Sequence, residues 1–207
     1  GQAHSSVLLP WIEAMLREHA LRLDECDAIA FGAGPGSFTG LRIACGVAQG
    51  LAWGAGKPVV AIGNLAAMAW QAAGNSAAPQ RVACAIDARM GEAYWAVFEV
   101  DGMRVREIVA PTLSASSSLV EVLLAHQPDA VAGNALTTFD LRWPDVVPKL
   151  FPNVRANAHA IAMLAVQAWA HGAVLAPADA RPHYVRDRVA QTIAERMQVR
   201  PISEAQP

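Results

Sequence analysis

The chain has 207 residues, of which 54% are hydrophobic and 16% charged, and its formal net charge at pH 7 is −2. That length allows one large domain or two small lobes with a sizeable core. The negative net charge excludes binding to nucleic acid by electrostatic attraction alone. Its three cysteines lack zinc spacing and no apolar run reaches the roughly 18 residues of a membrane span, so we expect a soluble cytoplasmic protein without membrane contact.

The first half of the chain predicts three helices and two short buried strands. Ser5 or Ser6 is suited to cap the first helix, with Pro10 in its first turn, and Asn64 is suited to cap the third. The predicted elements are a helix around 7–16, a strand at 28–31, a helix at 41–55, a strand at 59–62 and a helix to 73.

The second half opens with three strands joined by tight turns, one of them at Asp101-Gly102, a strong hairpin signal. A helix, a strand and a further helix follow. These elements are expected at 81–87, 92–100, 103–109, 118–126, 130–133 and 158–171. The order of the second half therefore resembles that of the first with three strands added in front.

A glycine-rich turn lies between the first predicted strand and the helix that follows it. It reads Gly34, Pro35, Gly36, Ser37, Phe38, Thr39, Gly40. Backbone N–H groups at such a helix N-terminus suit a phosphate or carboxylate. Arg42, two residues after the loop, is a candidate contact for the same anion. Leu41 stands where a Walker A loop needs lysine, and Thr39 stands where the Rossmann and nucleophile-elbow patterns need glycine. A tight structural turn is the alternative to an anion site.

Three stretches resemble the bacterial TsaB (YeaZ) family, in the order of that family. They read GPGSFTGLR from Gly34 with KPVVAI after the helix, IDARMGEAYWAVF from Ile86, and HYVRDRVA from His183. The resemblance implies an α/β chain with a duplicated actin-like, ribonuclease-H-like (ASKHA) fold. We expect an N-terminal lobe at 1–76 and a C-terminal lobe at 77–207. The family's first lobe begins with a three-strand meander that this sequence lacks, so about thirty residues are expected to be missing there.

Two clusters of polar residues are weaker site candidates. Asp87, Arg89 and Glu92 lie around one tight turn, where they could form a carboxylate or metal site, or an ordinary hairpin with an ion pair. Tyr184 and Arg186 could contact a partner or a nucleotide phosphate, or lie on a solvated strand. Both alternatives stay open at the level of residue type.

The six histidines form neither HExxH nor HxxxH. The resemblance implies that the catalytic relative TsaD carries a histidine pair, one helical turn apart, after the strand that corresponds to 59–62. Asn64 and Met68 stand at the matching positions here. Neither is suited to such a site, so we expect no metal and no peptidase activity.

The helix at 41–55 is apolar on all sides, with only Arg42 and Gln49 clearly polar, which indicates burial on a second side. The first helix is also rich in apolar residues. The resemblance implies pairing through these two helices, either with TsaD or with a second copy. The candidate contact residues are Leu8, Ile12, Met15, Val47, Ala48 and Leu51.

The resemblance implies a non-catalytic subunit that supports TsaD-type transfer of a threonylcarbamoyl group to adenosine 37 of tRNA. A TsaE-type ATPase would join the assembly, the chain alone would form a homodimer, and tRNA would be reached only through the complex. No intrinsic cofactor is expected, while ATP or ADP at the interface with the partner is left open. The alternative is a stand-alone actin-like enzyme, either a metal-dependent peptidase of the glycoprotease type or a small-molecule kinase. A scaffold without any ligand is a third reading.

Overall fold

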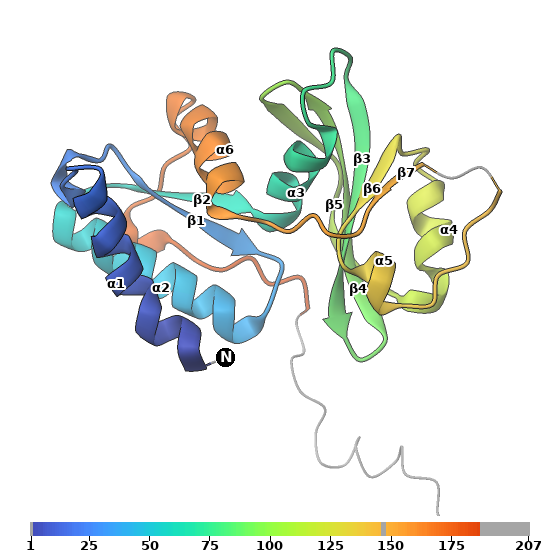
Figure 1. Ribbon diagram of the computed structural model, residues 1–207, viewed down its shortest axis with the longest axis horizontal. Helices are drawn as coiled ribbons and strands as arrows, with labels where there is room; N and C mark the ends of the chain where they lie inside the picture. The colour runs from blue at the N-terminus through green and yellow to red at the C-terminus, as the bar shows by residue number, and fades with distance from the viewer. Residues whose placement is uncertain (1, 146–147, 187–207) are drawn as a thin grey trace, which may run out of the picture.

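The computed structural model describes residues 2–145 and 148–186, and only the backbone of residues 2–6 (Figure 1). Two β-sheets with helices packed on them confirm the predicted α/β class. The helices are α1 (Gln2–Glu18), α2 (Phe38–Ala55), α3 (Asn64–Ala73), α4 (Leu119–Leu124), α5 (Ala135–Thr138) and α6 (Ala158–Ala170). The strands are β1 (Ile29–Gly34), β2 (Val59–Gly63), β3 (Gln80–Arg89), β4 (Glu92–Asp101), β5 (Arg104–Ala115), β6 (Ala130–Ala132) and β7 (Lys149–Phe151).

The first sheet consists of the parallel pair β1 and β2, with Ile29 opposite Val59. Alternate residues of a strand point to opposite faces, so each face has its own cover. On one face α2 packs through Cys45, Ala48 and Ala52. On the other face α6 packs through Ile161, Leu164 and Ala165. The cover of this second face therefore comes from about a hundred residues further along the chain.

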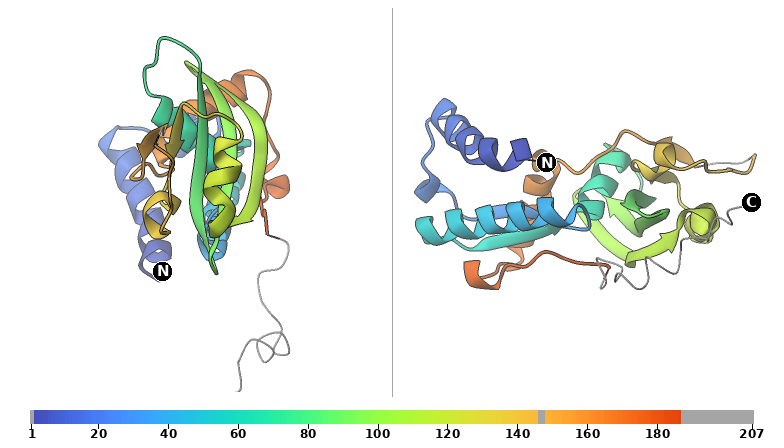
Figure 2. Two further views of the ribbon diagram at one scale, coloured as in Figure 1. Left: turned by 90° about the vertical axis from the view of Figure 1, so that its right-hand side faces the viewer. Right: turned by 90° about the horizontal axis from the view of Figure 1, so that it is seen from below.

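The second sheet has five strands in the order β5-β4-β3-β6-β7. The contacts of β4 with β3 and β5 are antiparallel, whereas β3-β6 and β6-β7 are parallel. Helix α3 covers one face through Leu65 and Met68, and α4 covers the other through Leu119 and Leu123. Because α3 directly follows β2, it carries the chain from the first sheet onto the second (Figure 2).

The type of each major helix and strand agrees with the sequence, but three helix starts do not. Helix α1 begins at Gln2, so Ser5 and Ser6 lie inside it and Pro10 lies beyond its first turn. Helix α2 begins at Phe38 because the Ser37 hydroxyl accepts a hydrogen bond from the Gly40 N–H at 3.3 Å, which adds a turn before the predicted start. Gly63, not Asn64, is the N-cap of α3.

The division of the chain into lobes at residue 76 stays a prediction. Helix α3 packs on the second sheet and α6 on the first, so both helices lie against the sheet that the sequence order assigns to the other half. In the part of the chain that is described, no helix is long and apolar enough to cross a membrane.

We predict that Gly133→Ala is far more destabilising than Gly56→Ala. Both glycines have positive φ, 120° and 64°, but a Cβ at Gly133 would overlap the Ala85 carbonyl of β3, whereas one at Gly56 meets nothing within 4 Å. Gly56→Ala should cost roughly 1–2 kcal/mol of unfolding free energy from backbone conformation alone. Gly133→Ala should cost more than about 3 kcal/mol, since clash adds to that strain. Chemical denaturation measures both, and equal losses would contradict the close approach of β3 to this turn.

Candidate functional site

A pocket of about 360 Å³ brings together the three stretches that the sequence singled out. One wall is the glycine loop with Pro35, Gly36 and Ser37. A second wall is the turn between β3 and β4, with Asp87 and Arg89. The third is residues 180–186, here called the strap, which supplies His183, Tyr184 and Arg186 to the pocket. The glycine loop, the hairpin and the C-terminal signature thus form one site.

The glycine loop is held by Asn64, the first residue of α3. Its side-chain N–H group donates to the Pro35 carbonyl at 3.1 Å. A Cβ at Gly32 would overlap the Asn64 side-chain oxygen, so the glycine is needed for this approach. The amide therefore anchors the loop, which is a different role from the helix cap that the sequence suggested.

The two positions at which the sequence resemblance predicted the place of a histidine pair have structural roles in this chain. Asn64 anchors the loop, and Met68 is buried between α3 and the second sheet. Within the described residues, no group of three His, Cys, Asp or Glu side chains is placed to hold a metal ion.

The β3–β4 turn has an unusual backbone. Arg89 and Met90 both have positive φ, 66° and 59°, a conformation uncommon for residues other than glycine. The Asp87 carboxylate accepts a hydrogen bond from the Arg89 N–H at 2.7 Å and lies 3.5 Å from its guanidinium. The Asn134 side-chain oxygen in turn accepts from the Asp87 N–H at 3.1 Å. The carboxylate and the backbone N–H of Asp87 therefore both stabilise the turn.

The strap binds the glycine loop at one end and the hairpin at the other. The His183 N–H donates to the Ala33 carbonyl at 2.7 Å, and Arg42 donates to the Tyr184 hydroxyl at 3.1 Å. Arg42 also lies 3.8 Å over the Phe38 ring, which stacks at 5.5 Å on Tyr184. At the far end, Arg186 forms an ion pair with Glu92 of β4. Arg42 near the glycine loop and Arg186 of the strap are therefore both held in one orientation at the edge of the pocket.

The predicted contact residues on α1 and α2 divide into exposed, half-buried and core positions. Met15 is 54% exposed, and Leu8, Ile12, Val47 and Leu51 are half-buried. Ala48 is only 3% exposed because it packs on β1, so it is a core residue and not part of an exposed contact surface.

A stripe of glycines on α2 was not among the contact residues predicted from the sequence. Gly46, Gly50 and Gly54 recur every four residues, are all exposed, and have open space where a Cβ would lie. A four-residue spacing places them on one face of the helix. The signal was present in the sequence, but the neighbouring alanines, which face the core, obscured it.

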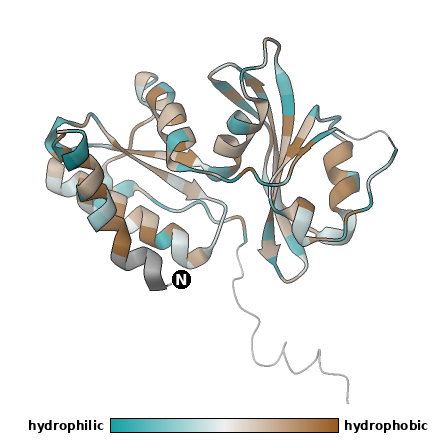
Figure 3. Cartoon of the chain, in the orientation of Figure 1, coloured by the Kyte–Doolittle hydropathy of each residue, from teal (hydrophilic) through white to brown (hydrophobic). Residues whose placement is uncertain are grey.

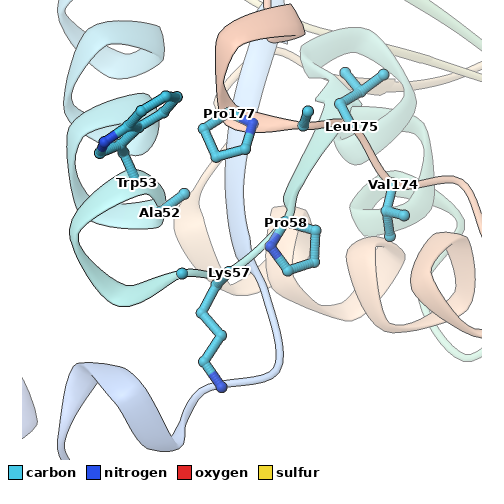
Figure 4. Close-up of a pocket in the computed structure, with 9 residues that line it drawn as sticks. Ala52, Trp53, Lys57, Pro58, Val174, Leu175 and Pro177 are labelled. Atoms are coloured by element: carbon cyan, nitrogen blue, oxygen red, sulfur yellow. The ribbon is translucent and has the colours of Figure 1, made fainter.

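A second, shallower hollow of about 470 Å³ lies at the C-terminal end of α2 (Figure 4). Its wall consists mainly of apolar residues, among them Trp53, Pro58 and Leu175, while the Lys57 side chain extends away from that wall. None of the sequence-predicted site residues lines it. We therefore place the candidate site in the pocket at the glycine loop.

Comparison with known proteins finds a matching family model and named relatives. The family model described as TsaD, tRNA N6-adenosine threonylcarbamoyltransferase, matches residues 1–191. The tRNA threonylcarbamoyladenosine biosynthesis protein TsaB of Escherichia coli (strain K12) is 33% identical over 201 residues, covering 90% of this chain and 82% of that protein. The Haemophilus influenzae protein of the same name is 51% identical over 94 residues, which is 45% of this chain and 39% of that protein.

Solved structures are similar over most of their length. A Pseudomonas aeruginosa protein, described as having similarity to the peptidase YeaZ, superposes with a TM-score of 0.78 at 36% identity. It covers 88% of this chain, which covers 84% of it. A second structure, YeaZ from the same organism, gives a TM-score of 0.77 at 35% identity.

We predict that Asp87→Ala destabilises the fold more than Arg89→Ala. The Asp87 side chain is 9% exposed and holds the turn by a charge-assisted hydrogen bond, so its loss should cost about 1.5–3 kcal/mol. The Arg89 side chain is 87% exposed, and removing such a surface partner should cost less than about 1 kcal/mol. Thermal unfolding of the two variants tests this, and an Asp87 variant as stable as the parent would leave the carboxylate without a structural role.

Proposed function

The chain belongs to the TsaB family of tRNA threonylcarbamoyladenosine biosynthesis proteins, and on that premise we propose that it is a non-catalytic partner of a TsaD-type threonylcarbamoyltransferase. In this role it would support transfer of the threonylcarbamoyl group to adenosine 37 of tRNA. The family membership confirms the resemblance drawn from the three motifs. The partner role is supported chiefly by one observation, the exposed glycine stripe on α2.

The glycine stripe is suited to close packing of a second helix. Without side chains at Gly46, Gly50 and Gly54, another helix can approach the α2 backbone closely. Half-buried Val47 and Leu51 flank the stripe and would supply apolar contact. Glycine in a helix interior costs roughly 1 kcal/mol relative to alanine, so three exposed glycines in one helix favour a contact function over a purely structural one.

Helix α1 extends the proposed contact surface. Leu9, Trp11 and Met15 are exposed, and Trp11 keeps 65% of its surface accessible. Apolar residues colour much of this helix brown (Figure 3). Exposed large apolar side chains that gather on one helix are typical of protein interfaces. We infer that α1 and α2 together form the surface for the TsaD-type partner, or for a second copy of this chain when the partner is absent.

We further infer that the two sheets are two lobes of a duplicated actin-like fold. In the second sheet, β6 leads through α5 to the parallel strand β7, next to the antiparallel strands β3–β5. In the first sheet, β1 leads through α2 to the parallel strand β2. The shared strand–helix–strand unit supports the duplication.

The other members of the proposed assembly follow from family membership and charge. A TsaE-type ATPase would join it. With a net charge of −2 this chain has little attraction for tRNA, which it would therefore meet through the complex. ATP or ADP is the ligand to test in the pocket at the glycine loop. The roles of Asn64 and Met68 in the loop and the core favour this assignment over a metal-dependent peptidase.

The direct test is a reconstituted modification assay. Unmodified tRNA is incubated with threonylcarbamoyl-AMP, the TsaD-type protein and the TsaE-type ATPase, with or without this chain, and modified adenosine is measured by mass spectrometry. Modification should depend on the chain, and the chain should co-purify with the TsaD-type protein. Equal modification in its absence would refute the proposal.

We predict opposite effects of Gly50→Leu on stability and on binding. Leucine should raise the unfolding free energy by roughly 0.8 kcal/mol and the Tm by about 2–3 °C, because its helix propensity exceeds that of glycine and its site is open. Affinity for the TsaD-type partner should fall at least about tenfold, since the added side chain holds the helices apart. Calorimetric unfolding and titration measure the two effects.

The matched control is Ala162→Leu, which adds a comparable side chain to an exposed position of α6, away from the proposed surface. It should leave partner affinity unchanged. If Gly50→Leu also binds like the parent, the stripe is not the contact surface.

A further inference from the structure

The strap, together with Pro177 just before it, follows one side of α2 through three side chains. Gln49 donates to the carbonyls of Pro177 and Ala180 at 3.0 and 3.2 Å, and the Cys45 thiol lies 3.6 Å from the Ala180 carbonyl. Arg42 holds Tyr184. Positions 42, 45 and 49 are three and four residues apart, so they share one helix face. In Figure 2 (right), the strap and α1 lie on opposite sides of α2.

The far end of the strap leaves the first sheet and attaches to the second. Besides its ion pair with Glu92, the Arg186 guanidinium lies 5.9 Å from the Tyr94 ring and 3.7 Å from the Met90 sulfur. The segment from His183 to Arg186 thus spans the pocket and forms one of its walls. Detachment at Arg186 would remove that wall.

The strap lacks the ladder of backbone hydrogen bonds that holds each strand around it. Residues 180–186 form no helix or strand, and Ala180 alone among them is fully buried. Between Ala180 and Arg186 the strap is held by the His183 bond to Ala33 and by the Tyr184 contacts with α2. Segments with few buried apolar contacts and few hydrogen bonds open locally while the remainder stays folded.

We propose that the strap is a latch: it closes the pocket when Arg186 pairs with Glu92, and it opens by local detachment that uncovers the Cys45 face of α2 while both sheets remain folded. This inference does not depend on the proposed partner. It predicts that the pocket alternates between a walled and an open state, so that any ligand touching the strap would favour the walled one.

Two native cysteines separate local opening from global unfolding. Cys45 is 4% exposed and lies beneath Ala180, so a thiol reagent reaches it when the strap detaches. Cys84 is fully buried in the core beneath α3, so it reacts only when the second sheet opens. Burial raises the pKa of both thiols, which keeps the background reaction slow. Because Cys26 is a third free and more accessible thiol, it is replaced by serine, and mass spectrometry of the digested chain after timed exposure to the reagent gives a rate for each of the two buried cysteines.

Breaking the latch should accelerate labelling of Cys45 alone. For Arg186→Ala we expect about a tenfold increase, or 1.4 kcal/mol, at Cys45 and no change at Cys84. Glu92→Gln should act alike, and the two substitutions combined should add little beyond either one, since they remove the same pair. The control Arg106→Ala removes the Arg106–Glu99 pair, an arginine–glutamate pair of β5 and β4 remote from the strap, and should change neither rate.

Two results would overturn the latch. If Cys45 reacts at the parental rate in Arg186→Ala, the ion pair does not hold the strap. If Cys45 and Cys84 accelerate together in that variant, the substitution loosens the whole fold and the strap is not a separate unit.

Discussion

The site depends on how closely three backbone segments approach one another at the end of β1. The Ala33 carbonyl accepts from His183, the Pro35 carbonyl accepts from Asn64, and a Cβ at Gly34 would lie 2.7 Å from the His183 carbonyl. Such contacts are possible only because glycines 32 and 34 carry no side chains. The glycines at the end of β1 therefore allow α3 and the strap to pack closely against this strand. The pocket is the space that remains beside that packing.

Much of the fold was predictable because local patterns carry it. Apolar runs that end at a glycine marked β1 and β2, and Asp101-Gly102 marked the hairpin of β4 and β5. The face that α6 covers was not predictable. From residue 156 to 178 the sequence has no charged side chain, so nothing in the pattern distinguishes one neighbouring sheet from the other. Long-range packing, which the periodicity does not report, places α6 against the first sheet.

Because sequence patterns do not report long-range contacts, two roles also remained possible for some of the site residues. The pairing of Asp87 with Arg89 spans two residues and was foreseen as the structural alternative. Tyr184 and Arg186 have partners 142 and 94 residues away, Arg42 and Glu92, so residue type alone could not separate a contact from a solvated strand. Ala48 was misplaced because two faces of α2 consist of small residues. The core face has alanines and a cysteine and another face has glycines, whereas the strap face has Arg42 and Gln49.

The route of the chain through the two sheets has a consequence for synthesis. The face of β1 and β2 that packs on α6 is complete in sequence by Gly63, but its cover arrives only with Ala158–Ala170. At translation rates of roughly 5–20 residues per second, about a hundred residues take on the order of 5–20 seconds to emerge. During that interval the nascent chain presents Val60 and Ile62 to solvent, while strands β3 to β5 can already pair as a local meander. The meander of the second sheet is thus complete in sequence well before α6 can cover the exposed face of the first sheet.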